Sequence, residues 1–231
     1  ASDWSSDVCS SDLAKNAALP LMAAAILGSG PLTLSNVPNL ADLGSMAELL
    51  RVLGVNIEWQ KGTRLGEGGT MRMTAPGPIA TFAPYDLVRK MRASFFVLGP
   101  LLARAQAARV SLPGGCAIGA RPVDIHLKGL AAMGAKIELS EGYVVASCPG
   151  GLVGTEFAFP MVSVGATENM LMAATLAKGR TVLTNAALEP EIGDLGACLL
   201  KMGARIQGLG TSRLVIDGVD ALGPAQHPVL P

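Results

Sequence analysis

The residues with the most evident chemical potential are a cysteine and an arginine on one glycine-rich stretch, Cys116 and Arg121. Gly114, Gly115 and Gly119 let the backbone around the cysteine turn sharply or expose its N–H groups, which other residues resist. A nearby guanidinium favours the thiolate, the reactive form of cysteine, and its planar fork suits a phosphate or a carboxylate. The stretch therefore predicts a reactive thiol beside an anion-binding group. A glycine-rich turn with a buried, inert cysteine is the alternative.

The composition of the 231-residue chain indicates a compact protein with a sizeable core. Half of the residues are apolar and 16% are charged, below the roughly 25% that is usual in soluble domains. Lys and Arg together number 18, as do Asp and Glu, so no net field attracts nucleic acid or an anionic membrane. We therefore expect neither as a partner.

The use of cysteine and histidine argues against a metal centre and against a disulfide framework. The four cysteines are scattered without a Cys-x-x-Cys pair, and only two histidines could assist them. The thiols are therefore expected to be reduced, in a cytoplasmic protein. The longest apolar stretches are interrupted by glycine well short of the roughly 20 residues that a membrane span needs.

An internal repeat organises the chain. A helix end of the form Leu-x-x-Leu/Met-Gly-Val/Ala-x-Ile occurs at 50–57, 130–137 and 199–206, about 70 to 80 residues apart, which is longer than a solenoid repeat. In each copy an apolar helix and a strand precede the helix with this motif, and another strand follows. The apolar helices are predicted at 17–27, 87–103 and 167–177, and the helices with the motif at 42–53, 123–133 and 192–202. The strands are predicted at 32–34, 55–59, 110–112, 135–139, 181–184 and 204–207.

The apolar helices determine the predicted architecture. A helix that is apolar on every face must be buried on every face. We therefore predict an α/β domain of three units, about 14–75, 76–150 and 151–225, with these helices inside and sheets plus amphipathic helices outside. Residues 1–13 form a polar, adapter-like leader that is excluded from this domain and is expected to be mobile.

Five segments, in order along the chain, resemble the UDP-N-acetylglucosamine 1-carboxyvinyltransferases, a family of enolpyruvyl transferases. One is the stretch around the cysteine, LPGGCAIGARPVD at 112–124. The others are AKNAALP at 14–20, APYDLVRKMRAS at 83–94, VSVGAT at 162–167 and NAALEPEI at 185–192. The resemblance covers the chain from about residue 14 to its end.

The resemblance implies an inside-out α/β barrel domain with pseudo-threefold symmetry, one of two such domains that close over the substrates in that family. The second domain, with the aspartate and arginine that it contributes, is expected to be missing here. The implied reaction transfers the enolpyruvyl group of phosphoenolpyruvate to the 3′-hydroxyl of UDP-N-acetylglucosamine and releases phosphate. This is the first committed step of peptidoglycan synthesis, and it requires no metal and no organic cofactor.

The resemblance also implies roles for individual residues. Cys116 would donate the proton, and it is the residue that the epoxide fosfomycin is expected to alkylate. Lys15 and Asn16 would bind phosphoenolpyruvate, while Arg92 and Arg121 would hold anionic groups. The residues that would bind the sugar nucleotide are Arg121, Pro122, Val123, Asp124 and Ile125, together with Val162, Ser163, Val164 and Gly165.

Several of these residues also have an ordinary structural interpretation. Lys15 and Asn16 could be the solvated start of a helix. Glu189 and Glu191 could be loop acids or helix caps. Alternatively, they could be partners of the basic residues that contact the substrate, without touching the substrate themselves. Arg92 begins an apolar run, so it needs either an anionic partner or a route to solvent.

Two other functions stay open on the sequence alone. One is that of the sister enolpyruvyl transferase of the shikimate pathway, which shares the fold. The other is a noncatalytic fragment that only binds the sugar nucleotide. Because the second domain is expected to be missing, we predict little or no turnover by this chain alone.

Overall fold

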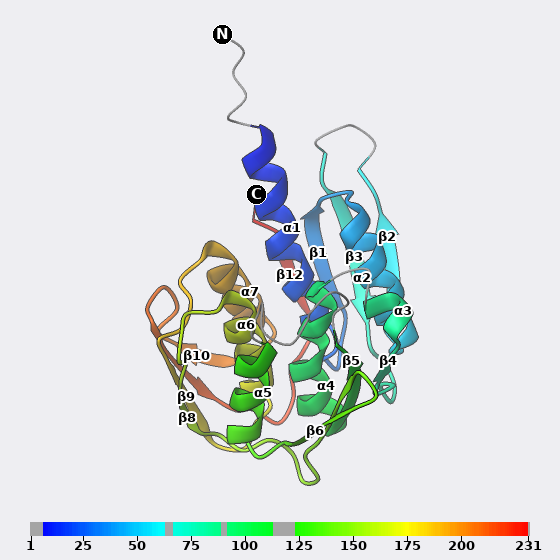
Figure 1. Cartoon of the computed structure of the whole chain (residues 1–231). Helices are drawn as coiled ribbons and strands as arrows, with labels where there is room; N and C mark the ends of the chain where they lie inside the picture. Colours follow the sequence, from blue (N-terminus) through cyan, green and yellow to red (C-terminus); the bar gives the residue numbers. More distant parts are fainter. Residues whose placement is uncertain (1–6, 63–66, 89–91, 113–122, 231) are drawn as a thin grey trace.

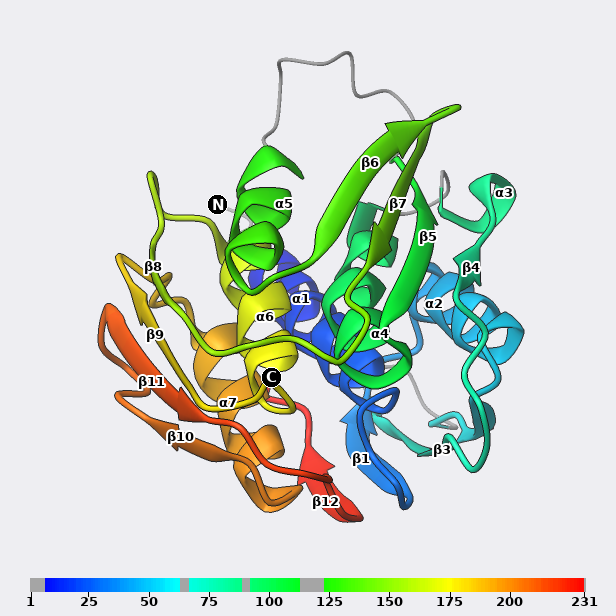
Figure 2. The ribbon, with the colours of Figure 1, turned by 90° about the horizontal axis from the view of Figure 1, so that it is seen from below.

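The computed structural model describes residues 7–62, 67–88, 92–112 and 123–230, and these form a mixed α/β fold. Figures 1 and 2 show helices in the middle of the molecule with the sheets around them. The central helices are α1 (Asp7–Ala24), α4 (Leu98–Ala105) and α6 (Val164–Ala174). The other helices are α2 (Ala41–Val52), α3 (Tyr85–Val88), α5 (Val123–Ala132) and α7 (Pro190–Lys201), and η1 (Arg92–Val97) is a 3₁₀ segment.

The three sheets share one strand order and one pattern of pairing. In each, the first strand is parallel to the second, and the remaining neighbours are antiparallel. One sheet has the order β12 (Ala225–Pro228), β1 (Leu32–Val37), β3 (Gly69–Thr74), β2 (Asn56–Gln60). The second has the order β4 (Phe82–Ala83), β5 (Ala107–Ser111), β7 (Tyr143–Ser147), β6 (Lys136–Ser140). The third has the order β8 (Glu156–Ala158), β9 (Arg180–Thr184), β11 (Arg213–Asp217), β10 (Arg205–Gln207).

The sheets are separate, so the described residues do not make a single closed barrel. The six predicted strands correspond to β1, β2, β5, β6, β9 and β10. The third strands β3, β7 and β11 and the short first strands β4, β8 and β12 were not predicted. Of these, β4 and β8 have only two and three residues, too few to carry a period-2 signal. The strand β12 also pairs with β1 from the opposite end of the chain, which no local pattern indicates.

The repeated helix ends have one geometry. Gly54, Gly134 and Gly203 have φ of +99°, +94° and +102°, a conformation that glycine adopts without a Cβ clash. Each glycine N–H bonds to the carbonyl three residues back, and the next N–H bonds to the carbonyl five residues back, as from Val55 to Leu50 at 2.9 Å. This pattern satisfies the last carbonyls of α2, α5 and α7. It explains why the motif recurs at these places.

The predicted apolar helix 87–103 is wrong as one element. It is divided into α3, η1 and α4. Pro100 has no N–H to donate, and in a regular helix its ring would clash with the carbonyl of Phe96. The α-helix therefore starts only at Leu98, after the 3₁₀ segment.

The N-terminal region also differs from the predictions. The helix α1 begins at Asp7 and so includes the end of the segment 1–13, while the mobility of that segment stays a prediction. Pro20 consequently lies inside α1 and not in its first turn. In α2 the N-cap is Leu40, and Asp42 lies in the first turn. There the positive end of the helix dipole stabilises its carboxylate.

One continuous hydrophobic cluster joins the central helices to the inner faces of the sheets. The helix α6 is buried along nearly its whole length and contacts α4, α5 and α7, whereas α1 contacts α2, α7 and η1. Among the helices that the structure describes, none combines the length and the apolar character needed to cross a membrane.

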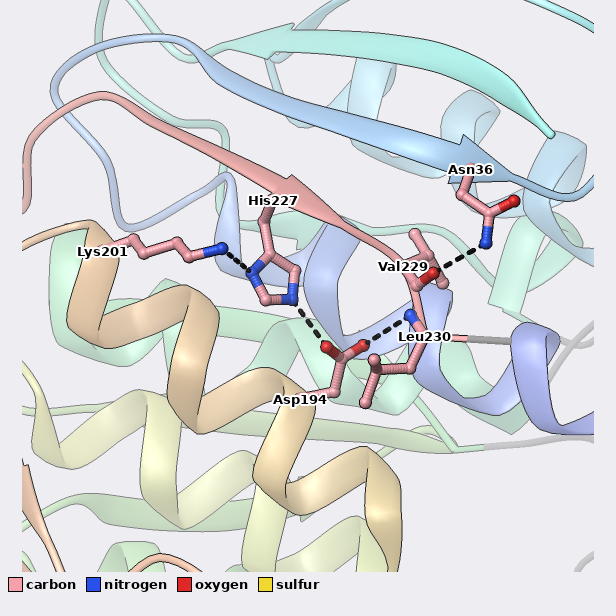
Figure 3. Close-up of polar contacts among 6 residues, drawn as sticks. All are labelled: Asn36, Asp194, Lys201, His227, Val229 and Leu230. Carbon is pink, nitrogen blue, oxygen red and sulfur yellow. Dashed lines mark hydrogen bonds and ion pairs between the residues drawn. The ribbon is translucent and has the colours of Figure 1, made fainter.

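A polar network around the buried pair Asp194 and His227 holds the last described residues against α7 and β1 (Figure 3). His227 lies between two residues of α7, with Nε2 2.6 Å from Asp194 Oδ1 and Nδ1 3.1 Å from Lys201 Nζ. Because an ammonium only donates, we assign the ring proton to Nε2, which donates to Asp194. The other oxygen of Asp194 accepts the Leu230 N–H at 3.3 Å, and Asn36 Nδ2 donates to the Val229 carbonyl at 2.9 Å.

Arg104, at the end of α4, joins the first two units of the chain. Its Nη1 donates to the carbonyls of Ile26 and Gly28, each at 2.7 Å, and its Nη2 donates to those of Ala75 at 2.7 Å and Gly77 at 3.4 Å. Partial burial lowers the pKa of the guanidinium below its usual value. The guanidinium nevertheless stays charged, so these carbonyls receive charge-assisted donors in a planar arrangement that no other side chain of similar length provides.

We expect Arg104→Met to lower the free energy of unfolding by about 2–3 kcal/mol, because several carbonyls lose a charged donor at once. Urea unfolding followed by circular dichroism measures this. Arg51→Met is the matched control, since Arg51 donates to a single carbonyl, that of Ile57 at 3.3 Å, and is exposed. Equal losses for the two variants would contradict the assigned role of Arg104.

Candidate functional site

The structure describes most, but not all, of the predicted site residues. Cys116, Arg121 and Pro122 lie outside the described residues. Arg92 is the first residue of η1, and its side chain is likewise not described. Val123, with the two residues that follow it, forms the first turn of α5. Of those two, Asp124 is exposed and Ile125 is 3% exposed.

The second predicted nucleotide segment forms the start of α6. Ser163 is the N-cap, and its Oγ accepts the Ala166 N–H at 3.4 Å. Val162 before it is 53% exposed, and Val164 and Gly165 occupy the first turn, half-buried. The first N–H groups of a helix have no partner within the helix, so this turn can donate to an anion or a carbonyl.

Thr167 connects this helix to the segment before α7. Its hydroxyl donates to the Ser163 carbonyl at 2.8 Å and accepts the Ala187 N–H at 3.1 Å. The predicted segments 162–167 and 185–192 therefore lie side by side, as the contact between α6 and α7 also shows.

One buried amide, Asn169, brings three of the predicted segments together. Its Oδ1 accepts the Gly99 N–H of α4 at 2.7 Å. Its Nδ2 lies 3.0 Å from the Phe95 carbonyl of η1 and 2.9 Å from His126 Nδ1 of α5. Because η1 begins at Arg92 and α5 begins at Val123, this amide fixes the elements that carry both segments against α6.

His126 directly follows the predicted segment 121–125, but its residue type alone indicated only a potential metal ligand. Its ring meets Phe95 edge-on at a centroid distance of 5.3 Å. Although part of the residue stays exposed, desolvation of the ring lowers the pKa of His126 to about 4. The imidazole is therefore neutral at physiological pH.

Lys15 and Asn16 lie on α1, inside the helix and not at its start. Lys15 Nζ is 3.5 Å from Asp42 Oδ2 of α2, and both side chains are partly exposed. Asn16 is exposed. The helix α1 also packs against η1, so Lys15 belongs to an element that contacts the one beginning at Arg92.

The two predicted acidic residues lie at the start of α7, close to a third carboxyl group. Glu189 is the N-cap, and its Oε2 accepts the Leu188 N–H at 3.0 Å. Among the described residues, no basic side chain pairs with it or with Glu191, so support of basic site residues stays a prediction. Glu168 of α6 is 1% exposed. Burial first, and then the charges of Glu191 and Glu189, raise its pKa well above the usual value.

The described residues contain no group of three or more His, Cys, Asp or Glu side chains arranged to hold a metal ion. What they do provide is a set of hydrogen-bond donors at the starts of α5 and α6. Such donors suit phosphate and carboxylate oxygens.

A mixed α/β domain with these features matches the fold of the enolpyruvyl transferases. It superimposes on the enolpyruvyl transferase NikO from Streptomyces tendae with a TM-score of 0.81 at 22% identity, covering 94% of this chain and 50% of that one. An EPSP synthase from Acinetobacter baumannii gives a TM-score of 0.64 at 19% identity, covering 92% of this chain and 48% of that one.

The chain belongs to the EPSP synthase (3-phosphoshikimate 1-carboxyvinyltransferase) family, whose model matches residues 3–231. It is 61% identical over 223 residues to a UDP-N-acetylglucosamine 1-carboxyvinyltransferase from Rhodospirillum centenum, covering 94% of this chain and 51% of that protein. A protein of the same name from Dinoroseobacter shibae is 59% identical over 217 residues. The chain thus spans about half the length of the curated relatives that it matches.

Proposed function

We propose that this chain is part of an enolpyruvyl transferase that acts on phosphoenolpyruvate and UDP-N-acetylglucosamine. The observation that carries the proposal is the meeting of η1, α5 and α6 around Asn169, because these elements begin with three of the predicted substrate segments. The names of the relatives favour UDP-N-acetylglucosamine over 3-phosphoshikimate as the acceptor. The cell-wall role would follow from that acceptor: the first committed step of peptidoglycan synthesis, in the cytoplasm.

The reaction proposed has an addition and an elimination. The 3′-oxygen of the sugar bonds to the phosphate-bearing carbon of phosphoenolpyruvate while the methylene carbon receives a proton, for which Cys116 is the proposed donor. The hydroxyl proton of the sugar leaves to a base. The new methyl group then loses a proton, the carbon–phosphate oxygen bond breaks, and phosphate leaves.

The positive groups have a defined task in this scheme. Lys15, Arg92 and Arg121 would hold the phosphate and carboxylate groups, whose charge changes along the path. Residues 121–125 and 162–165 would bind the sugar nucleotide at the starts of α5 and α6. No step in this scheme calls for a metal or an organic cofactor.

The half of the relatives that this chain does not span would supply the second domain. The common strand order of the three sheets supports a pseudo-threefold, inside-out arrangement of this half, with the central helices inside. We propose that both domains are needed for turnover, and that this half alone retains sugar-nucleotide binding.

Fosfomycin labelling tests the proposal with the chain as it stands. We expect intact mass spectrometry to show one adduct, stronger with UDP-N-acetylglucosamine present and absent in Cys116→Ser. Cys148 and Cys198 are an internal reference, because burial raises the pKa of both thiols, that of Cys198 to about 12, and disfavours the thiolate.

Peptide mapping then shows which cysteine carries the adduct, Cys9 included. Labelling that is no stronger with the nucleotide than without it, or that persists in Cys116→Ser, would contradict the proposed site. Shikimate 3-phosphate in place of the sugar nucleotide separates the two enolpyruvyl acceptors, since only the true acceptor is expected to enhance labelling.

A further inference from the structure

The orientation of the Asn169 side chain is determined by its surroundings. The Gly99 N–H can only donate, so the atom 2.7 Å from it must be the amide oxygen. The Phe95 carbonyl can only accept, so the atom 3.0 Å from it must be the amide nitrogen. A Cβ on Gly99 would lie 2.5 Å from the Asn169 carbonyl oxygen and 2.7 Å from Oδ1, so only glycine permits this approach.

The same amide nitrogen faces His126 Nδ1 at 2.9 Å. An amide NH₂ donates and does not accept, so Nδ1 must be the unprotonated nitrogen of the ring. The proton of the neutral imidazole is then on Nε2. We infer that Asn169 is a positioning residue that holds His126 in the Nε2–H form, so that the ring presents an uncharged donor at the start of α6.

The position of Nε2, near the first turn of α6, indicates what this donor could bind. A Cβ built on Gly165 would lie 3.4 Å from His126 Cε1 and 3.6 Å from Nε2, so the outer edge of the ring lies against the first turn of α6. Among the described residues, none forms a hydrogen bond with Nε2. The ligand class that fits is an acceptor oxygen of an anionic group, shared between Nε2–H and the first N–H groups of α6.

This inference rests on the proposed function for the identity of the ligand, which would be the sugar nucleotide. A neutral donor differs from a cation in one respect that matters here. It can hold a nucleotide oxygen without taking up a proton, so the binding step leaves the protonation of His126 unchanged.

The protonated nitrogen can be identified without any ligand. In the chain labelled with ¹⁵N-histidine at pH 7, long-range ¹H–¹⁵N correlation spectra distinguish a protonated ring nitrogen from an unprotonated one. His126→Gln assigns the signals, and His227, whose Nδ1 faces Lys201, is the internal reference. We expect Nδ1 of His126 to be unprotonated. A proton on Nδ1, alone or together with one on Nε2, would overturn the inference.

Asn169→Asp tests the assignment of this role to Asn169. A carboxylate accepts where the amide donates, so we expect the proton to appear on Nδ1 of His126. Asn185→Asp is the matched control, because Asn185 Nδ2 donates to the Phe159 carbonyl at 2.9 Å and does not touch His126. Unchanged His227 signals show that the variant is folded. An unprotonated Nδ1 in folded Asn169→Asp would refute the role, and the wild-type spectrum decides the tautomer if the variant does not fold.

UDP-N-acetylglucosamine titration separates this inference from the proposed function. We expect the nucleotide to shift the Nε2–H signal, and Asn169→Asp to weaken binding by about tenfold, the loss expected for one hydrogen bond to a charged group. If Nδ1 is unprotonated but the nucleotide leaves His126 unchanged, the proposed ligand is wrong while the role of Asn169 stands. If Nδ1 is protonated, the role of Asn169 fails whatever binds.

Discussion

Asp194→Ala is expected to lower the free energy of unfolding by about 2–4 kcal/mol, because two hydrogen-bond donors lose a charged acceptor at a buried site. Asp194 and His227 have side chains 1% and 4% exposed, and their atoms are 2.6 Å apart. Without the carboxylate, the His227 Nε2–H and the Leu230 N–H both lose their acceptor (Figure 3). Chemical denaturation at pH 7 measures the loss.

The chain provides a matched control on its surface. Asp217 forms a two-point ion pair with Arg180, at 2.7 and 3.0 Å, on neighbouring strands that leave Arg180 exposed and Asp217 partly exposed. Asp217→Ala likewise removes a hydrogen-bonded carboxylate, but solvent screens its interaction with Arg180 and can replace it. A loss in Asp194→Ala no greater than in Asp217→Ala would show that burial of the His227 network contributes nothing.

Hydrogen exchange then localises the effect of Asp194. Because the network holds the segment 227–230 beside α7 and β1, we expect the amides of β12 to lose protection first. Uniform loss across the three sheets would mean that Asp194 acts on the whole core instead.

Stability is expected to fall with rising pH on account of Glu168, and Glu168→Gln should remove that fall. Desolvation first, with the charges of Glu191 and Glu189 after it, raises the pKa of this carboxyl well above its usual value of 4.5. Its Oε2 has no hydrogen-bond partner among the described residues. The folded state therefore favours the neutral acid.

The sign of the pH dependence follows from linkage. Above the unfolded-state pKa near 4.5 the unfolded chain releases this proton while the folded chain keeps it, so stability falls by up to about 1.4 kcal/mol per pH unit. The contribution is fully present below that value and is lost as the pH rises through the folded-state pKa of Glu168. Denaturation midpoints between pH 4 and pH 8 record the slope.

Glutamine is the informative replacement because it keeps the size of the side chain and cannot ionise. We expect Glu168→Gln to have a flatter pH profile than the wild type and a higher stability at the upper end of the range. Glu138→Gln on the exposed strand β6 is the control and should keep the wild-type slope. A slope that survives in Glu168→Gln would assign the pH dependence to another group.

The sequence by itself determined the family, the apolar central helices and the helix ends. The five ordered motifs need only the residues and their order. The helix ends at Gly54, Gly134 and Gly203 could be predicted because the left-handed turn and its two hydrogen bonds lie within six consecutive residues. Burial of α6 was predicted from its apolar run, although Thr167, Glu168 and Asn169 of this helix are buried as well. The helix break at Pro100 was in principle local too, but the apolar run concealed it.

Only the tertiary structure decided the partners of the polar residues. Asn169 meets His126, 43 residues away, and His227 meets Asp194, 33 residues away. The residue types alone allowed each of these side chains to be solvated, capped or paired. Which of these occurs depends on how much water the packed helices exclude and on which groups then face one another. For the same reason the neutral state of Glu168 follows from the packing of α6 against α7, and not from any pattern in the chain.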